Sequence, residues 1–202
     1  KIKKLVGSEF LKLKGTWIFW IHLGVPVAGA GLFLLYGVAA KREWQSVLEF
    51  YAETLAIVYP SVSAIICMQS VMQELKAGNF QNLLCVSTLR WSAVLRKILT
   101  LWILGLAASL LAFLLFGMGV WGTKAAWNLS VKEYLICGLI LWITQAGIYL
   151  LHFFLAMRFG SGACLAAGVT QSLIAALLFT GLGDGLWMWF PCGWSGHLLL
   201  YY

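Results

Sequence analysis

The residues from Gln73 to Lys97 read QELKAGNFQNLLCVSTLRWSAVLRK, and they lie between two long apolar stretches of the chain. Five side chains in this segment are charged, and Gly78 and Asn79 interrupt it. A charged side chain is costly in the hydrocarbon core of a bilayer, whereas an apolar helix of about 20 residues is stable there. We therefore predict that residues 73–97 form a polar connection between two membrane helices.

The amino-acid composition is that of a membrane protein. Of the 202 residues, 62% are hydrophobic and 10% are charged, and the mean hydropathy is +0.90. Soluble domains carry about 25% charged residues. This chain has too few polar side chains to cover the surface of a soluble protein, so we predict a polytopic membrane protein.

Five segments are long and apolar enough to span a bilayer, which requires about 20 mostly apolar residues. They are Trp17–Tyr36, Phe50–Met72, Ile98–Val120, Tyr134–Met157 and Ala163–Leu182. Backbone polar groups in hydrocarbon must be paired within their own segment, so these segments must be helices. Because the connections are short, we predict an all-α fold in which residues 1–202 form a single transmembrane helix bundle.

The last stretch, residues 183–202, reads GDGLWMWFPCGWSGHLLLYY and is interrupted by Pro191 and several glycines. Aromatic side chains settle at the level of the lipid headgroups. We therefore predict an interfacial or re-entrant element on the extracytoplasmic side, with Trp187, Trp189 and Trp194 at the membrane interface. A sixth helix is expected to follow it.

Positively charged side chains are concentrated on one side of the predicted spans. Ten lie before the first span, after the second or after the fourth: Lys1, Lys3, Lys4, Lys12, Lys14, Lys76, Arg90, Arg96, Lys97 and Arg158. Four lie on the opposite side: Lys41, Arg42, Lys124 and Lys132. Because cytoplasmic loops are enriched in Lys and Arg, we predict a multi-pass plasma-membrane protein with a cytoplasmic amino terminus. This asymmetry explains the net charge of +7 and gives no reason to expect a nucleic-acid partner.

Residues 1–14 have apolar positions at helical spacing, with lysines on the opposite face. This pattern is typical of an amphipathic helix that lies in the cytoplasmic membrane interface. The lysines expected to contact anionic lipid headgroups are Lys3, Lys4, Lys12 and Lys14.

Signatures of catalysis and of metal binding are missing from the sequence. The chain has no HExxH, GxSxG or GxxxxGK[ST] motif, and its five cysteines show no CxxC spacing. We therefore expect no enzymatic activity, metal or cofactor in this chain. An intramembrane hydrolase using His22 or His152 is the enzymatic alternative, but no nucleophile or metal set accompanies either histidine. Cys192 is the cysteine expected to face the outside.

The pattern of residues 80–84, in the central part of the polar connection, predicts a short helix. Phe80, Leu83 and Leu84 would share one face of it, between the polar residues Gln81 and Asn82. A short helix with an aromatic anchor suits insertion into a groove on a partner protein. The alternative is a helix that rests on the lipid surface.

Three ordered stretches resemble the ABC-2 type permeases of lantibiotic-immunity transporters. They are SEFLKLKGTWIFWIHLGVPVAG at residues 8–29, QELKAGNFQNLL at residues 73–84, and LRKILTLWILG at residues 95–105. The resemblance implies a six-helix permease with a cytoplasmic coupling helix between the second and third spans. It assigns the coupling role to Glu74, Asn79, Phe80, Gln81, Asn82, Leu83 and Leu84.

The resemblance also implies partners and a function. Two permease subunits, identical or homologous, would pair with two cytoplasmic ATPase subunits that bind ATP and Mg. The complex would expel lantibiotic peptides from the bacterial cytoplasmic membrane of the producer cell. The alternatives are an ABC-2 exporter of a drug, an ion or a lipid-linked polymer, and a non-transporting membrane sensor or assembly subunit.

Overall fold

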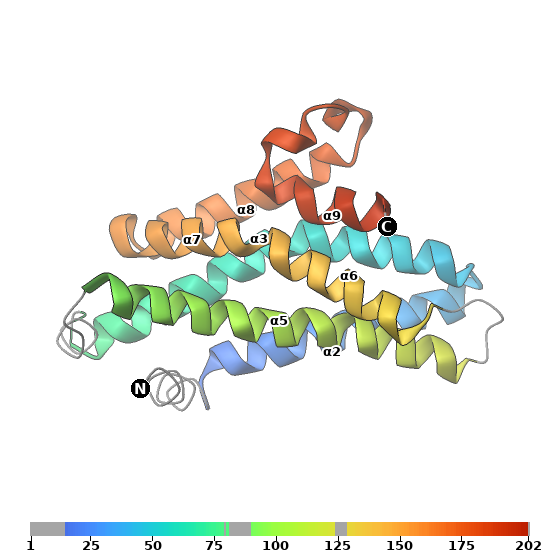
Figure 1. The fold of residues 1–202 in the computed structure, drawn as a ribbon, viewed down its shortest axis with the longest axis horizontal. Helices are drawn as coiled ribbons and strands as arrows, with labels where there is room; N and C mark the ends of the chain where they lie inside the picture. Colours follow the sequence, from blue (N-terminus) through green and yellow to red (C-terminus); the bar gives the residue numbers. More distant parts are fainter. Residues whose placement is uncertain (1–14, 79, 81–89, 124–128, 202) are drawn as a thin grey trace.

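The structure, a computed structural model, describes residues 15–78, 80, 90–123 and 129–201. These residues are almost entirely helical, and none of them forms a β-strand (Figure 1). Five of the helices or helix pairs are long and apolar enough to cross a membrane. The predicted all-α membrane helix bundle is therefore confirmed.

The helices follow the order of the predicted spans. The elements are α2 (Trp17–Ala40), α3 (Trp44–Lys76), α5 (Arg90–Gly122), α6 (Val131–Thr144), α7 (Ala146–Phe159), α8 (Ser161–Leu178), η1 (Gly181–Gly183), η2 (Trp187–Trp189) and α9 (Pro191–Tyr201). The short elements η1 and η2 are 3-10 helices, and α6 and α7 together make the fourth span.

Helices α3 and α5 extend well beyond the predicted second and third spans. Residues 73–76 form the last turn of α3, and residues 90–97 form the first two turns of α5. Only residues 77–89 separate the two helices, so residues 73–97 include the last turn of α3 and the first turns of α5. The cytoplasmic coupling role of residues 73–97 stays a prediction.

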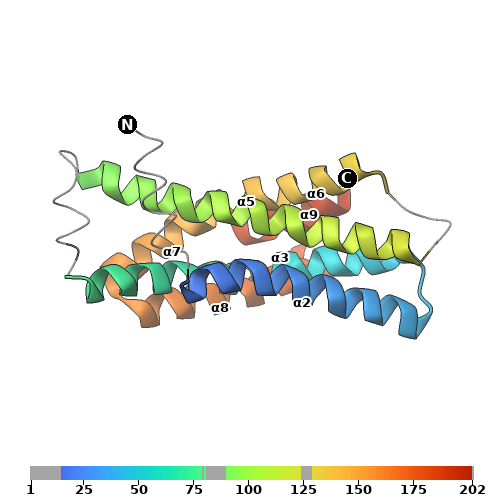
Figure 2. The ribbon, with the colours of Figure 1, turned by 90° about the horizontal axis from the view of Figure 1, so that it is seen from below.

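The two ends of the bundle carry the charge groups that the sequence predicted. In Figures 1 and 2, the start of α2, the end of α3, the start of α5 and the turn between α7 and α8 lie at the left. The α2–α3 turn and the start of α6 lie at the right. The left end therefore includes Lys76 and Arg158, and the right end includes Lys41, Arg42 and Lys132. Which end faces the cytoplasm stays a prediction.

Close packing of α3 on α8 depends on a glycine. A β-carbon at Gly168 would overlap that of Ala64 and would lie 3.1 Å from the carbonyl oxygen of Pro60. Beside this crossing, the hydroxyl oxygens of Ser61 and Ser172 lie 2.7 Å apart. Lipid tails are as apolar as Leu, so membrane helices associate through close packing and interhelical hydrogen bonds of this kind.

The fourth span is interrupted near its middle at Gln145, between α6 and α7. Trp142 and Trp102 are stacked across the α5–α6 contact, with ring centroids 4.0 Å apart. The indole of Trp142 donates to the carbonyl of Trp102 at 2.8 Å, and the indole of Trp102 donates back at 3.2 Å. The buried Gln145 amide donates to Ser195 in α9 at 3.2 Å. These bonds link the break to both neighbouring helices.

Part of the carboxyl-terminal stretch, residues 191–201, forms a regular α-helix. Pro191 is the first residue of α9, a position at which a helix needs no backbone donor. Helix α9 packs on α3 and α6, while η1 and η2 form the loop at the top of Figure 1. Residues 181–190 thus form short 3-10 turns and residues 191–201 a regular helix, and the interfacial or re-entrant placement of this element stays a prediction.

Candidate coupling site between the second and third spans

The end of α3 folds the backbone sharply back on itself. The amide of Ala77 donates to the carbonyl of Gln73 at 3.0 Å, and Gly78 has a φ of 125°. The amide of Phe80 then donates to the carbonyl of Glu74 at 3.3 Å. The start of the connection is thereby held against the last turn of α3.

Phe80 has a strained backbone. Its φ of 65° lies in the left-handed region, which costs a bulky side chain on the order of 1–3 kcal/mol. Its half-buried ring packs against a core cluster that includes Ala64, Leu101 and Phe153. Packing of the ring within the same chain offsets the strain and leaves only part of the ring surface for a partner protein.

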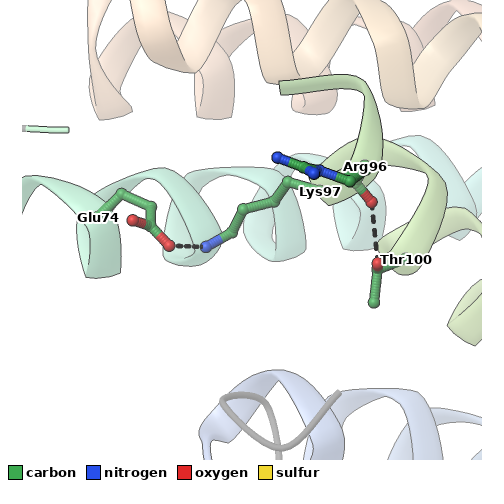
Figure 3. A network of polar contacts seen from close by, with 4 residues as sticks. All are labelled: Glu74, Arg96, Lys97 and Thr100. Carbon is green, nitrogen blue, oxygen red and sulfur yellow. Dashed lines mark hydrogen bonds and ion pairs between the residues drawn. The ribbon is translucent and has the colours of Figure 1, made fainter. Parts of the chain in front are cut away.

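Glu74 and Lys97 form an ion pair between α3 and α5 (Figure 3). The pair is buried, with side-chain exposures of 8% for Glu74 and 5% for Lys97. A charge buried without a partner is strongly destabilising, so each of these side chains requires the other. On the next turn of α5, the hydroxyl of Thr100 donates to the carbonyl of Arg96 at 2.8 Å.

The ion pair links the ends of two helices. It joins the last turn of α3 to α5, on either side of residues 77–89. Separating the two helix ends would leave two unpaired buried charges, so a force applied to the connection acts on both helices together. From the sequence, Lys97 was expected only to add to the positive charge of the connection. The position of Lys97 could have indicated burial, because it directly precedes an apolar run. A helix that continues into that run places Lys97 close to the membrane.

Most of the predicted coupling residues lie outside the described part of the chain. These are Asn79, Gln81, Asn82, Leu83 and Leu84, and the interface lysines Lys3, Lys4, Lys12 and Lys14 also lie outside it. Glu74 and Phe80 come together at the end of α3, as described above. The coupling role of all seven residues stays a prediction.

The three tryptophans of the carboxyl-terminal element differ in exposure. Trp189 is 81% exposed, which suits an interface residue. Trp187 is half-buried and stacks on His197, with ring centroids 4.8 Å apart. Trp194 donates its indole hydrogen to the carbonyl of Met188 at 2.9 Å. Trp187 and Trp194 thus stabilise the element itself, and the interface role of all three stays a prediction.

The hydrogen bonds of the buried His152 differ from those of a catalytic histidine. The described residues contain no group of three His, Cys, Asp or Glu side chains that could hold a metal. Ser63 donates its single hydroxyl proton to the carbonyl of Pro60 at 2.9 Å, so it accepts from Nδ1 of His152 at 2.8 Å. An activated serine would instead donate to the histidine. This contact is an interhelical hydrogen bond between α3 and α7.

A hollow lies at the opposite end of the bundle, between the start of α3, the start of α6 and the end of α9. We call it the acidic hollow; it contains about 1040 Å³ of empty space, part of which is open to the surroundings. Its polar lining includes Gln45, Glu49 and Glu133, and its apolar lining includes Leu48 and Phe113. This lining can accept positively charged and apolar groups side by side.

A comparison with known protein families matches residues 5–183 to the family described as ABC-2 family transporter protein. No curated protein and no solved structure matches the chain. The matched region covers the first 3-10 helix and every helix that could span a membrane. ABC-2 permeases are transmembrane subunits that work with separate ATPase subunits. This chain belongs to the ABC-2 family of transporter proteins.

Proposed function

We propose that this permease expels lantibiotic peptides from the membrane of the cell that makes them. Support for the transport function comes from the family, and support for the substrate comes from the resemblance of residues 8–29, 73–84 and 95–105 to lantibiotic-immunity permeases. The functional complex would contain a second permease subunit, identical or homologous, and two ATPase subunits that bind ATP and Mg.

The observation that carries the proposal is the buried pair of Glu74 and Lys97 beside residues 77–89. A motor subunit bound to this connection would move it when ATP closes the ATPase dimer. Because the ion pair ties α3 to α5, the movement would tilt the second and third spans as a unit. The proposed coupling residues would then link ATP binding to a rearrangement of the whole bundle.

The acidic hollow is the proposed contact for the peptide. A lantibiotic with basic and apolar side chains would place its charges near Glu49 and Glu133 and its apolar groups near Leu48 and Phe113. If the amino terminus is cytoplasmic, this hollow opens at the outer end of the bundle. A peptide in the outer leaflet would then reach it from the side.

The coupling proposal is tested by purifying the tagged chain in mild detergent from its native host. Mass spectrometry should find a stoichiometric ATPase subunit, and Phe80→Ala should reduce its recovery. Phe159→Ala is the matched control, because Phe159 is 63% exposed at the same end of the bundle. Equal ATPase recovery from both variants would contradict the role of Phe80, and no ATPase with the wild-type chain would favour a sensor or assembly subunit.

The substrate is tested by growth inhibition of a sensitive strain that expresses the complete complex. Resistance to a lantibiotic should rise, and it should disappear when the ATPase subunit cannot hydrolyse ATP. Glu49→Gln with Glu133→Gln should lower resistance without lowering the amount of complex in the membrane. Resistance to unrelated drugs but not to lantibiotics would instead support the alternative of another ABC-2 exporter.

A further inference from the structure

The fourth span changes helix partners at its break. Helix α6, before Gln145, packs mainly on α5 and α9, whereas α7, after it, packs mainly on α3 and α8 (Figure 1). Helix α6 lies close against α5, because a β-carbon at Gly138 would come within 2.9 Å of Leu110. The two halves of this span therefore belong to two helix groups, α5 with α6 and α3 with α7 and α8.

The backbone at the break forms a short 3-10 turn. The amide of Gln145 donates to the carbonyl of Trp142, three residues earlier, at 3.3 Å, whereas an α-helix uses the carbonyl four residues earlier. Neither α6 nor α7 contains proline, so the turn is not imposed by a missing backbone donor. A 3-10 turn inside a helix often marks a functional hinge. The fourth span can therefore bend at Gln145.

Side chains pair with the carbonyl groups at this turn. The hydroxyl of Thr144 lies 3.0 Å from the carbonyl oxygen of Leu141, which would accept the amide four residues later in a continuous helix. The same hydroxyl lies 2.9 Å from the carbonyl oxygen of Ile140, and the indole of Trp102 donates to the carbonyl of Trp142. Threonine hydroxyls that bond to their own helix in this way often bend it. These contacts stabilise the interrupted form of the span.

The side chain of Gln145 is incompletely paired. It is fully buried, and its amide nitrogen donates to Ser195 on α9. Its Oε1 forms no hydrogen bond with the described residues, and turning the amide would only exchange which polar atom is unpaired. A buried acceptor without a donor disfavours the observed arrangement. A movement at the break that brings a donor to Oε1 would therefore be favoured.

We propose that Gln145 is the centre of a hinge about which α6 swings relative to α7 during the ATP-driven cycle. The ion pair of Glu74 and Lys97 joins α3 to α5 at one end, so a tilt applied there reaches both helix groups. The hinge lets the other ends of the groups move apart. Both α3 and α6 line the acidic hollow, so its width would change. The proposal rests on the ATPase partners of the family and not on the identity of the substrate.

The test measures distances between spin labels in the complete complex. The shared anchor is Leu173→Cys on α8, paired with Val131→Cys on α6 or Phe159→Cys on α7, and all three positions are exposed. The five native cysteines are replaced, and labelled chain is diluted with unlabelled chain to suppress distances between copies. Positions 131 and 159 each lie fourteen residues from Gln145. Fourteen residues make about 21 Å of helix, so a bend of about 20° moves position 131 by about 7 Å.

Trapping the nucleotide with vanadate should change the distance from position 131 by about this amount and leave the distance from position 159 unchanged. Equal changes in both pairs would mean that the span moves as a rigid rod. No change in either pair, with nucleotide trapped in the same sample, would mean that the break is static. Either result would overturn the hinge. Absence of trapped nucleotide would refute the ATP-driven cycle and the hinge together.

A variant of Thr144 tests the side-chain support of the break. Thr144→Val removes the hydroxyl that pairs with the carbonyl of Leu141, which favours a continuous helix, so the distance change at position 131 should become smaller. Thr54→Val is the matched control, because the Thr54 hydroxyl donates to the carbonyl of Phe50 at 2.8 Å within an uninterrupted helix. Gel filtration checks folding. A full distance change in folded Thr144→Val would contradict a hinge that depends on this contact.

Discussion

A charged side chain near the end of a membrane helix can be stabilised by water or by an opposite charge. Lys76, Lys41 and Arg42 are exposed, whereas Glu74 and Lys97 are buried and pair with each other. All five residues look alike in the sequence, because each lies at the edge of an apolar stretch. Their different environments follow from which helix faces which neighbour, and only the packed bundle determines that.

Loss of either member of the ion pair should destabilise the bundle. Glu74→Ala or Lys97→Ala leaves one buried charge without its partner, and breaking a buried pair in this way costs about 3–5 kcal/mol. The thermal unfolding temperature of the detergent-solubilised protein should fall in both variants. Lys76→Ala is the matched control, since Lys76 is exposed on the same turn, and it should change the temperature little.

Replacing both partners separates stability from coupling. Glu74→Leu combined with Lys97→Met removes both charges, and such apolar replacements are often neutral or stabilising. The double variant should therefore recover the unfolding temperature, and it should keep transport, because apolar packing would still join α3 to α5. Loss of transport in a stable double variant would show that coupling needs the charges themselves.

At the scale of whole helices, the crossing of α3 and α8 should be sensitive to the size of one residue. Gly168→Ala places a methyl group against Ala64 and the carbonyl of Pro60, and such overpacking costs about 1–3 kcal/mol. The unfolding temperature should decrease. Gly162→Ala on the same helix meets nothing within 4 Å, and it should leave the temperature unchanged or raise it slightly.

The stacked pair of Trp102 and Trp142 should stabilise the interrupted fourth span. Trp142→Phe keeps an aromatic ring but removes the hydrogen bond to the Trp102 carbonyl, a loss of about 0.5–1.5 kcal/mol. Trp102→Phe should act similarly. The double variant should lose less stability than the sum of the losses in the two single variants, because the residues are in contact.

Trp121→Phe on α5 is the control, because Trp121 is 45% exposed. Additive losses would mean that the two indoles act independently.

For the whole molecule, cysteine labelling determines which end of the bundle faces the cytoplasm. In a Cys85→Ser background, Arg42→Cys in the α2–α3 turn should react with a membrane-impermeant maleimide in intact cells. Ala77→Cys should react only after the cells are permeabilised, because it lies at the opposite end of the bundle. Both positions are exposed, so access alone decides the rate. The reverse pattern would invert the predicted orientation.

The native Cys192 should contribute little to this labelling. Its predicted place on the outer side stays a prediction, and the structure shows it 4% exposed against α8 and η2. Burial also raises the pKa of its thiol, so less reactive thiolate is present near pH 7. Labelling of Cys192 should be slow and should increase as the pH rises. Fast labelling at pH 7 would show that α9 detaches from the bundle.

The class of the fold follows from the amino-acid sequence alone. Apolar segments of about 20 residues must be helices in a membrane, since backbone groups find no other partners there. The five spans and the polar connection after the second span follow from this constraint, and the charge difference between the two ends follows from the distribution of Lys and Arg. Of the candidate site, the sequence identified Glu74 and Phe80 through the resemblance, but it did not pair Glu74 with Lys97.

Which residues contact one another depends on how the helices pack in the bundle. The pairs Glu74 with Lys97, Trp102 with Trp142, and Ser61 with Ser172 are separated by 23, 40 and 111 residues along the chain. Hydropathy reports how a residue partitions between lipid and water, but it carries no information about which helix will be its neighbour. Those neighbours arise from close packing of helices whose lipid-facing surfaces are chemically alike.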